Sequence, residues 1–184
     1  MKEYANAGDF RTIFTEDASN LRLLSLLLTA DSEKAEKCFV TGLEDCANGS
    51  PVFLRWARSW AQRTITQNAI REMAPICDSA DRPSRSVALE KSRAQLALSE
   101  EHRHFASILS LEIFERFVIV LSVLERYSDR ECALLLGTSL PVIRETRMRA
   151  LKQIADSNRT QGLSPDDFDD ALLGFHLKTV GATE

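Results

Sequence analysis

The sequence is poor in the residues that interrupt helices. Its 184 residues include only 7 glycines and 5 prolines, and alternating β-branched runs are scarce. Glycine and proline are unfavourable in helix interiors, whereas alternation with a period of two is the pattern of strands. With 44 % hydrophobic residues, the chain has enough apolar side chains for a core, which excludes disorder over most of its length. These features favour an all-α protein.

Cysteine is also scarce, and its four positions form no C-x-x-C pair and no matched Cys/His spacing: Cys38, Cys46, Cys77 and Cys132. We therefore expect free, mostly buried thiols in a reducing cytoplasm, with no metal site and no cofactor. The three histidines have no spaced partners, and the sequence lacks a nucleophile elbow, a P-loop and a dinucleotide-binding glycine motif. An enzyme is not expected.

Long hydrophobic runs are missing as well. The most apolar stretch, Phe117–Leu124, has eight residues, whereas a membrane-spanning helix needs about 20. The polar, acidic sequence after Met1 does not resemble a secretory signal peptide. The sequence therefore predicts a soluble, cytoplasmic protein without a membrane partner.

The charge is slightly negative overall but unevenly distributed. The formal net charge is −4, which argues against indiscriminate coating of nucleic acid. Residues 156–184 carry 2 basic against 6 acidic groups, whereas four basic groups and one acid lie between Arg144 and Lys152. The basic patch is thus small and local.

Helical spacing divides the chain into two parts. Residues 1–16 show no convincing period and predict a loose arm or a short helix. Leucines recur at three and four residues from Leu21, which indicates a first clear helix, and Asp31 or Ser32 can cap a second that reaches about Asp45. A turn at 48–51, in which Gly49 can adopt positive φ, leads to a third helix from about Pro51 to Met73. We expect Trp56 and Trp60 in its core face. These segments predict a helical domain at 1–75.

The rest of the chain predicts a second helical domain. A polar segment at 74–86 contains two prolines and three serines, and residues 76–109 form a linker with a helical part. A domain follows at 110–155, whose first helix covers about Glu112–Glu125. An acidic extension occupies 156–184. The extension could act as a latch against the basic patch, or it could pack on the domain as a small helix.

The segment 127–154 carries the signals of a helix-turn-helix. Ser128 and Glu131 form a capping box, Gly137 suits the left-handed end of a helix, and Ser139 with Pro141 can begin the next helix. Two short helices joined by a glycine turn form this motif, and the second helix usually enters the major groove. On that helix we expect inward apolar contacts from Ile143, Ala150 and Ile154 and from either Met148 or Thr146.

The outer face of the second helix is basic. Arg144, Arg147, Arg149 and Lys152 could meet phosphates and guanine edges together. An ordinary solvated surface or a protein-docking module would have a similar pattern. The DNA-binding interpretation requires that these guanidinium groups are not held in internal ion pairs. The predicted DNA-facing residues are Ser139, Leu140, Pro141, Val142, Arg144, Glu145, Arg147, Met148, Arg149 and Lys152.

The same stretch resembles region 4 of bacterial sigma-70-family factors of the extracytoplasmic-function (ECF) type. Members show E-x-A-x-x-L-G-x-S followed by V-K-x-R-x-x-R-A, and the spacing holds here without a gap. The matching positions are Tyr127, Ser128, Glu131, Ala133, Leu136, Gly137, Ser139, Ile143, Arg144, Arg149 and Ala150. "LRLLSLLLTADSEKAEK" and "FLRWARSWAQRTI", which keeps Phe53, Trp56 and Ala61, are similar to region 2, more loosely.

The resemblance implies a function in transcription initiation. A sigma-like protein binds core RNA polymerase through region 2 and reads promoter DNA through region 4, and an anti-sigma protein is a possible further partner. By this resemblance the polymerase-binding residues are Asp31, Glu33, Glu36, Lys37, Val40 and Thr41. Two alternatives remain open. The chain could be a helix-turn-helix regulator that no longer binds polymerase, or an interaction module that titrates an anti-sigma factor.

Overall fold

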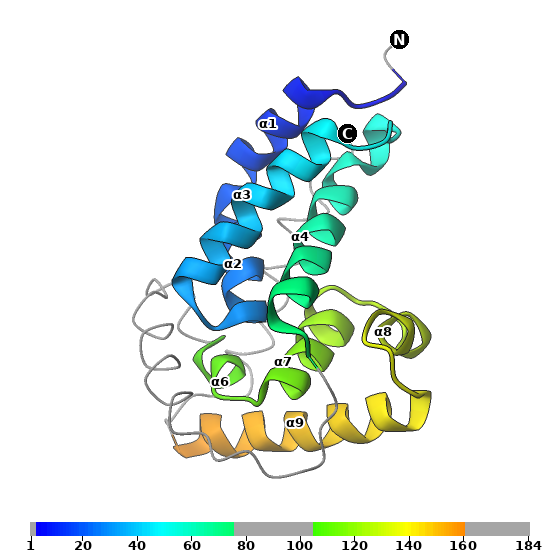
Figure 1. Cartoon of the computed structure of the whole chain (residues 1–184). Coiled ribbons are helices and arrows are strands. Elements are labelled where there is room, and N and C mark those ends of the chain that lie inside the picture. Colours follow the sequence, from blue (N-terminus) through cyan, green and yellow to red (C-terminus); the bar gives the residue numbers. More distant parts are fainter. Residues whose placement is uncertain (1–2, 76–104, 161–184) are drawn as a thin grey trace. The chain divides into compact units, whose positions relative to one another are not determined.

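The computed structural model describes residues 3–75 and 105–160, and these residues form helices and no strand (Figure 1). The all-α prediction is confirmed. The described chain separates into two compact units, an N-terminal unit of residues 3–74 and a C-terminal unit that includes residues 105–160. Cys77, the linker residues 76–104 and the acidic extension from residue 161 onward, with its latch hypothesis, lie outside the described residues. No described helix combines the length and apolar character needed to cross a membrane.

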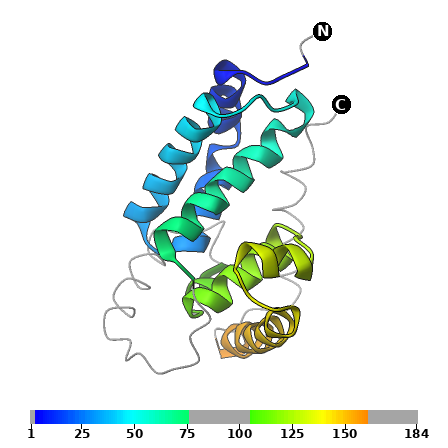
Figure 2. The same ribbon diagram turned by 45° about the vertical axis from the view of Figure 1, so that its right-hand side comes forward.

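Four α-helices and one 3₁₀ turn form the described part of the N-terminal unit: α1 (Ala7–Glu16), α2 (Ala18–Thr29), α3 (Ser32–Asn48), η1 (Leu54–Trp56) and α4 (Ala57–Met73). Helices α3 and α4 run antiparallel side by side, and α1 and α2 pack against both (Figures 1 and 2). Asp31 caps α3 by accepting a hydrogen bond from the Lys34 N–H at 2.9 Å, as the sequence predicted.

Helix α1 is more regular than the sequence suggested. Asn6 and Asp9 form a capping box, because the Asn6 side chain accepts from the Asp9 N–H and the Asp9 carboxylate accepts from the Asn6 N–H. Phe10, Ile13 and Phe14 are buried. Of the two alternatives predicted for 1–16, the short helix is the one that forms after Asn6, since these three residues provide a short apolar stripe.

Glycine allows a close approach at two places, Gly42 within α3 and Gly49 directly after it. A Cβ on Gly42 would lie 2.9 Å from Ile65 Cγ1 of α4, so a side chain would separate the two helices. At the end of α3, a Cβ on Gly49 would lie 2.6 Å from the Asp45 carbonyl oxygen. Gly49 has φ −80°, so the expected positive φ is absent, and a close backbone approach explains the glycine instead.

The two tryptophans are not in the core, contrary to the prediction. Helix α4 begins at Ala57, after η1, and its buried residues are uncharged and mostly small: Ala57, Ala61, Thr64, Ile65, Thr66, Asn68 and Ala69. Trp56 is 52 % exposed and Trp60 38 % exposed. The Trp56 ring instead meets the Phe53 ring edge-on at 5.2 Å, and the Arg55 guanidinium lies 4.7 Å from its centroid. Alanines face the core because they let α4 approach its neighbours closely.

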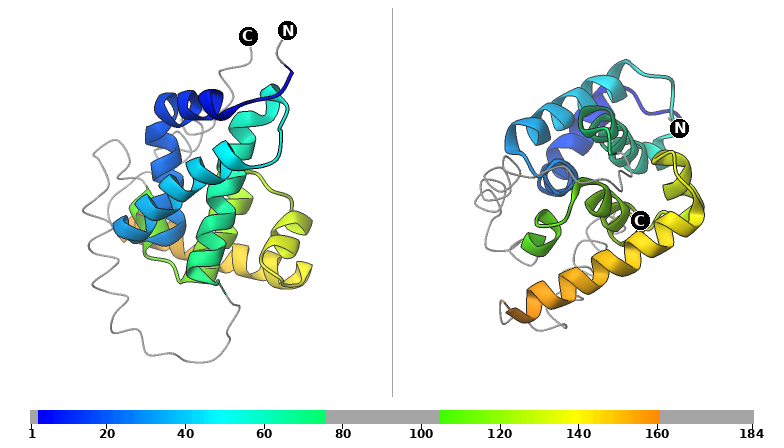
Figure 3. Two further views of the ribbon diagram at one scale, coloured as in Figure 1. Left: turned by 45° about the horizontal axis from the view of Figure 1, so that its top comes forward. Right: turned by 60° about the horizontal axis from the view of Figure 1, so that its bottom comes forward.

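The described helices of the C-terminal unit are α6 (Ala106–Leu109), α7 (Ile113–Ile119), the π-helical η3 (Val120–Leu124), α8 (Asp129–Leu135) and α9 (Leu140–Thr160). Helix α7 packs along α9, and α8 lies beside the N-terminal end of α9 (Figure 3). Phe114, Phe117, Val118 and Leu121 point inward as predicted. This packing leaves the far side of α9 open.

Candidate nucleic-acid interface

Local sequence signals build the α8–turn–α9 hairpin. The Ser128 side chain accepts a hydrogen bond from the Glu131 N–H at 3.3 Å, and the Glu131 carboxylate accepts from the Ser128 N–H at 2.8 Å. Gly137 follows α8 with φ +62°, and the Thr138 N–H donates to the Ala133 carbonyl at 2.9 Å. This bond closes a Schellman turn. The capping box and the left-handed glycine are both confirmed.

Helix α9 has one buried and one open face. Its buried stripe contains Ile143, Thr146, Ala150 and Ile154, so Thr146 and not Met148 takes the inward position. Met148 is 68 % exposed. The open side of α9 carries Leu140, Pro141, Arg144, Glu145, Met148, Arg149 and Lys152. Ser139, just before the helix, is also exposed, while Val142 and Arg147 are half-buried. The hairpin therefore gathers most of the predicted DNA-facing residues on one surface.

One carboxylate of α8 binds two arginines of α9. The Arg144 Nε donates to Asp129 Oδ2 at 2.9 Å, and the Arg147 Nη1 donates to the other oxygen, Oδ1. Hydrogen bonds from Arg144 and then Arg147 lower the pKa of the Asp129 carboxyl. Asp129 therefore stays ionised and joins the first turn of α8 to two successive turns of α9.

A second acid holds a third arginine. The Arg149 Nε donates to Glu115 Oε1 at 2.7 Å, and Glu115 is only 7 % exposed. Glu115 lies on α7, next to Arg116, whose buried guanidinium donates to the Leu111 carbonyl at 3.2 Å. Burial lowers the pKa of Arg116 to about 10, so the group still carries a charge at neutral pH. Arg149 thus connects the open side of α9 to a charged interior.

These contacts contradict the expectation that the basic face is free of internal ion pairs. Of its four cations, Arg144, Arg147 and Arg149 have acidic partners, and only Lys152 lacks one among the described residues. The pairs were not foreseen because they join residues on different helices, 15 to 34 positions apart. The requirement for DNA binding, a basic face without internal ion pairs, is therefore not met by three of the four cations. The side chains of Arg144 and Arg149 are nevertheless 67 % and 60 % exposed, so each is accessible to a partner that shares it with its acid.

Apolar side chains add to the same hairpin surface. Leu134 on α8 is 75 % exposed, and Leu140 joins Met148 on α9 with 39 % exposure. An exposed apolar side chain can meet a thymine methyl group in the major groove or an apolar patch on a protein. The hairpin can therefore serve either kind of partner.

The residues predicted to bind polymerase lie on or just before α3. Glu33, Glu36, Lys37 and Val40 are exposed, whereas Asp31 and Thr41 are half-buried. Glu36 accepts two hydrogen bonds from Arg22 of α2, both at 3.1 Å, and Lys37 pairs with Glu72 of α4 at 2.7 Å. Two of the six residues thus already join helices within the unit.

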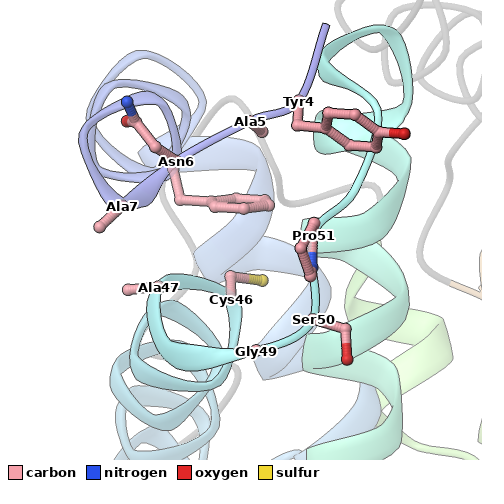
Figure 4. A pocket seen from close by; sticks show the side chains of 10 residues that line it. Tyr4, Ala5, Asn6, Ala7, Cys46, Ala47, Gly49, Ser50 and Pro51 are labelled. Atoms are coloured by element: carbon pink, nitrogen blue, oxygen red, sulfur yellow. The ribbon is translucent and has the colours of Figure 1, made fainter.

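A hollow of 540 Å³ lies in the N-terminal unit (Figure 4). It opens between residues 4–7, before and in α1, and residues 46–51, at the end of α3. The Cys46 thiol at its wall is buried, and burial raises its pKa, so the thiol stays protonated and is a poor nucleophile. Cys38 and Cys132 are likewise buried and unpaired, and burial raises the pKa of each to about 11.

Comparison with models of known protein families gives no match, and no curated protein matches the chain in sequence.

Proposed function

We propose that the chain is a sigma-like transcription protein that binds core RNA polymerase and reads promoter DNA through α9. The observation that carries this proposal is the α8–α9 hairpin, with its Schellman turn at Gly137 and an open face on α9 after the turn. A helix presented in this way fits the major groove of duplex DNA. The looser region 2 resemblance assigns polymerase binding to the N-terminal unit.

The side chains on that face suit base edges. A guanidinium such as that of Arg144 can bind guanine, the Glu145 carboxylate can accept from the cytosine amino group, and Leu140 or Met148 can contact a thymine methyl. Lys152, which has no acidic partner among the described residues, suits a phosphate. Such a mixture supports sequence-selective binding better than general coating of DNA.

The internal ion pairs weaken DNA binding by the free chain. A phosphate that contacts Arg147 or Arg149 must share it with Asp129 or Glu115, so part of the electrostatic gain is already used within the protein. Duplex affinity of the free chain is accordingly low, and polymerase supplies the remaining affinity in the complex. This agrees with the resemblance, because sigma factors of this type usually bind promoters only with polymerase.

A second candidate, a protein-interaction module that titrates an anti-sigma factor, is favoured by a specific observation. Three arginines of α9 are already paired, while Leu134 and Met148 are largely exposed on the same hairpin. Reduced free charge combined with exposed apolar side chains is typical of a protein partner.

One experiment separates these functions. The full chain is mixed with bacterial core RNA polymerase, and run-off transcription is measured on a genomic fragment library, with Val40→Glu as the α3 variant and Arg11→Ala as an exposed control. We expect promoter-dependent transcripts that Val40→Glu reduces and Arg11→Ala leaves unchanged. If the chain binds duplex DNA but does not bind core polymerase and gives no promoter-dependent transcript, it would be a regulator. Binding to neither would contradict the proposal and favour the interaction module.

A further inference from the structure

The two arginines that share Asp129 are held in different ways. Arg144 uses its Nε atom, and its two terminal amino groups donate to no acceptor among the described residues. Arg147 uses a terminal amino group, and its side chain is only 29 % exposed, against 67 % for Arg144. Asp129 itself is mostly covered, with 19 % of its side chain exposed. The same acid thus anchors Arg147 and leaves the outer end of Arg144 open.

We infer that Asp129 is a positioning residue for sequence specificity, which holds Arg144 by its Nε so that the two terminal amino groups face a base edge. The inference rests on the proposed function and names the residue that makes the contact selective. A guanidinium recognises guanine through two parallel hydrogen bonds, and this geometry needs a fixed plane. An arginine that is already ordered loses less conformational freedom when it binds.

Two effects of removing the Asp129 charge have opposite signs. The net charge of the site becomes more positive by one unit, which strengthens attraction to any phosphate backbone and increases the salt dependence of binding. Arg144 at the same time loses the contact that orients it, which weakens binding to the preferred sequence. If Asp129 acts only through its charge, its removal changes the affinities for the preferred sequence and for other sequences together. If it positions Arg144, its removal changes the ratio of these two affinities.

The chain offers a matched control on α9 itself. Asp156 pairs with Arg159 at 3.7 Å, and 60 % of its side chain is exposed. Asp156→Asn removes one negative charge from α9, as Asp129→Asn removes one from α8, but Asp156 makes no ion pair with Arg144 or Arg147. The difference between the two variants therefore reports the loss of the Asp129 contacts, and Arg144 is the more exposed of the two arginines that these contacts hold.

The test uses the full chain, with core RNA polymerase added where the free chain does not bind. A duplex library with a randomised segment gives the preferred sequence, and competition against a scrambled duplex gives the ratio of specific to non-specific affinity. We expect Asp129→Asn to lower this ratio about fivefold or more, while non-specific affinity is unchanged or higher. Asp156→Asn should leave the ratio within about twofold.

Asp129→Glu guards against a folding defect, which thermal melting would reveal. This variant keeps the charge but moves the carboxylate by one methylene. The ratio of specific to non-specific affinity should therefore fall by less than in Asp129→Asn, and the salt dependence of binding should stay as in the wild type. Equal ratios for Asp129→Asn and Asp156→Asn would overturn the inference alone. If the wild-type chain enriches no sequence, with or without polymerase, the proposed function fails and the inference fails with it.

Discussion

The two units arrange their clustered charges in opposite ways. In the N-terminal unit, one cation lies between two acids, because Arg58 of α4 binds both Glu16 and Asp17. In the C-terminal unit, one acid lies between two cations, because Asp129 binds both Arg144 and Arg147. The first cluster keeps an excess of negative charge and the second an excess of positive charge. The difference indicates that only the C-terminal cluster suits an anionic partner.

The interiors differ as well. The described buried polar residues of the N-terminal unit are neutral: Ser25, Thr29, Thr64, Thr66 and Asn68. The C-terminal unit buries the charged Glu115 and Arg116 beneath α9. Charge changes should therefore affect stability little in the N-terminal unit and strongly in the C-terminal unit.

The largest expected effect concerns Glu125, at the end of η3. Its Oε1 atom is buried without a hydrogen-bond partner among the described residues, and burial raises its pKa from 4.5 to about 7. The folded state therefore binds a proton that the unfolded chain has released, and stability falls as pH rises from about 4.5 to about 7. Glu125→Gln cannot ionise, so its free energy of unfolding should exceed that of the wild type by about 2–3 kcal/mol at pH 8.

Urea unfolding at pH 4 and pH 8 checks this prediction. The difference in the free energy of unfolding between Glu125→Gln and the wild type should vanish near pH 4, where the wild-type carboxyl is mostly protonated in both the folded and the unfolded state. Glu33→Gln, on the exposed side of α3, is the control in the N-terminal unit and should give no such gain. If Glu125→Gln and Glu33→Gln changed the free energy of unfolding by the same amount at both pH values, the contrast between the two interiors would be removed.

The next effect is on binding. Arg144→Ala should weaken affinity for the preferred duplex by about 1–3 kcal/mol, the value of a bidentate base contact. Arg11→Ala, an exposed cation of the N-terminal unit, should have no effect. Fluorescence anisotropy with labelled duplex, in the presence of core polymerase, measures both. A loss of a few tenths of a kcal/mol or less for Arg144→Ala would remove this residue from the site.

Ion pairs of the two units should also differ in their contribution to stability. Arg149→Ala leaves the buried Glu115 without its cation, and we expect a loss of about 1–2 kcal/mol in the free energy of unfolding. Arg22→Ala breaks an exposed pair with Glu36 and should cost less than about 1 kcal/mol. Denaturant titration of both variants measures these costs. The contrast would be lost if Arg22→Ala proved the more costly change.

The smallest effect involves the glycine of the turn. Gly137→Ala should destabilise the C-terminal unit by about 1 kcal/mol, because φ +62° is strained for a residue with a Cβ although space is available. Gly42→Ala in the N-terminal unit meets Ile65 instead, so its cost comes from packing. Gly137→Asn, which tolerates this φ, should restore part of the loss in thermal melts. No recovery with asparagine would mean that backbone strain is not the cause.

Features encoded within a few residues were predictable from the sequence. The capping box of Ser128 and Glu131, the left-handed Gly137 and the cap at Asp31 each depend on side chains next to the backbone that they satisfy. The α8–turn–α9 hairpin could therefore be located from local signals. The capping box of Asn6 and Asp9 was equally local and was overlooked because the apolar stripe that follows it is short.

Features that depend on contacts between helices were not predictable. The burial of Ala57 and Ala61 in place of Trp56 and Trp60 follows from how closely α4 packs, which spacing alone does not reveal. The partners of the α9 arginines are also distant, since Arg144 is 15 residues from Asp129 and Arg149 is 34 residues from Glu115. A basic stripe in the sequence therefore overstated the charge that the folded protein leaves unpaired.

The most direct measurement is the salt dependence of duplex binding for the wild type and Lys152→Ala, each as the full chain with core polymerase. If Arg147, Arg149 and Lys152 each contact a phosphate, α9 should contribute a slope of about −3 to log affinity against log salt. Removal of Lys152, the cation without an internal partner among the described residues, should make the slope shallower by about one. Identical slopes for the two proteins would show that Lys152, which has no acidic partner in the part of the chain that the structure describes, does not meet the DNA backbone, and would contradict the account.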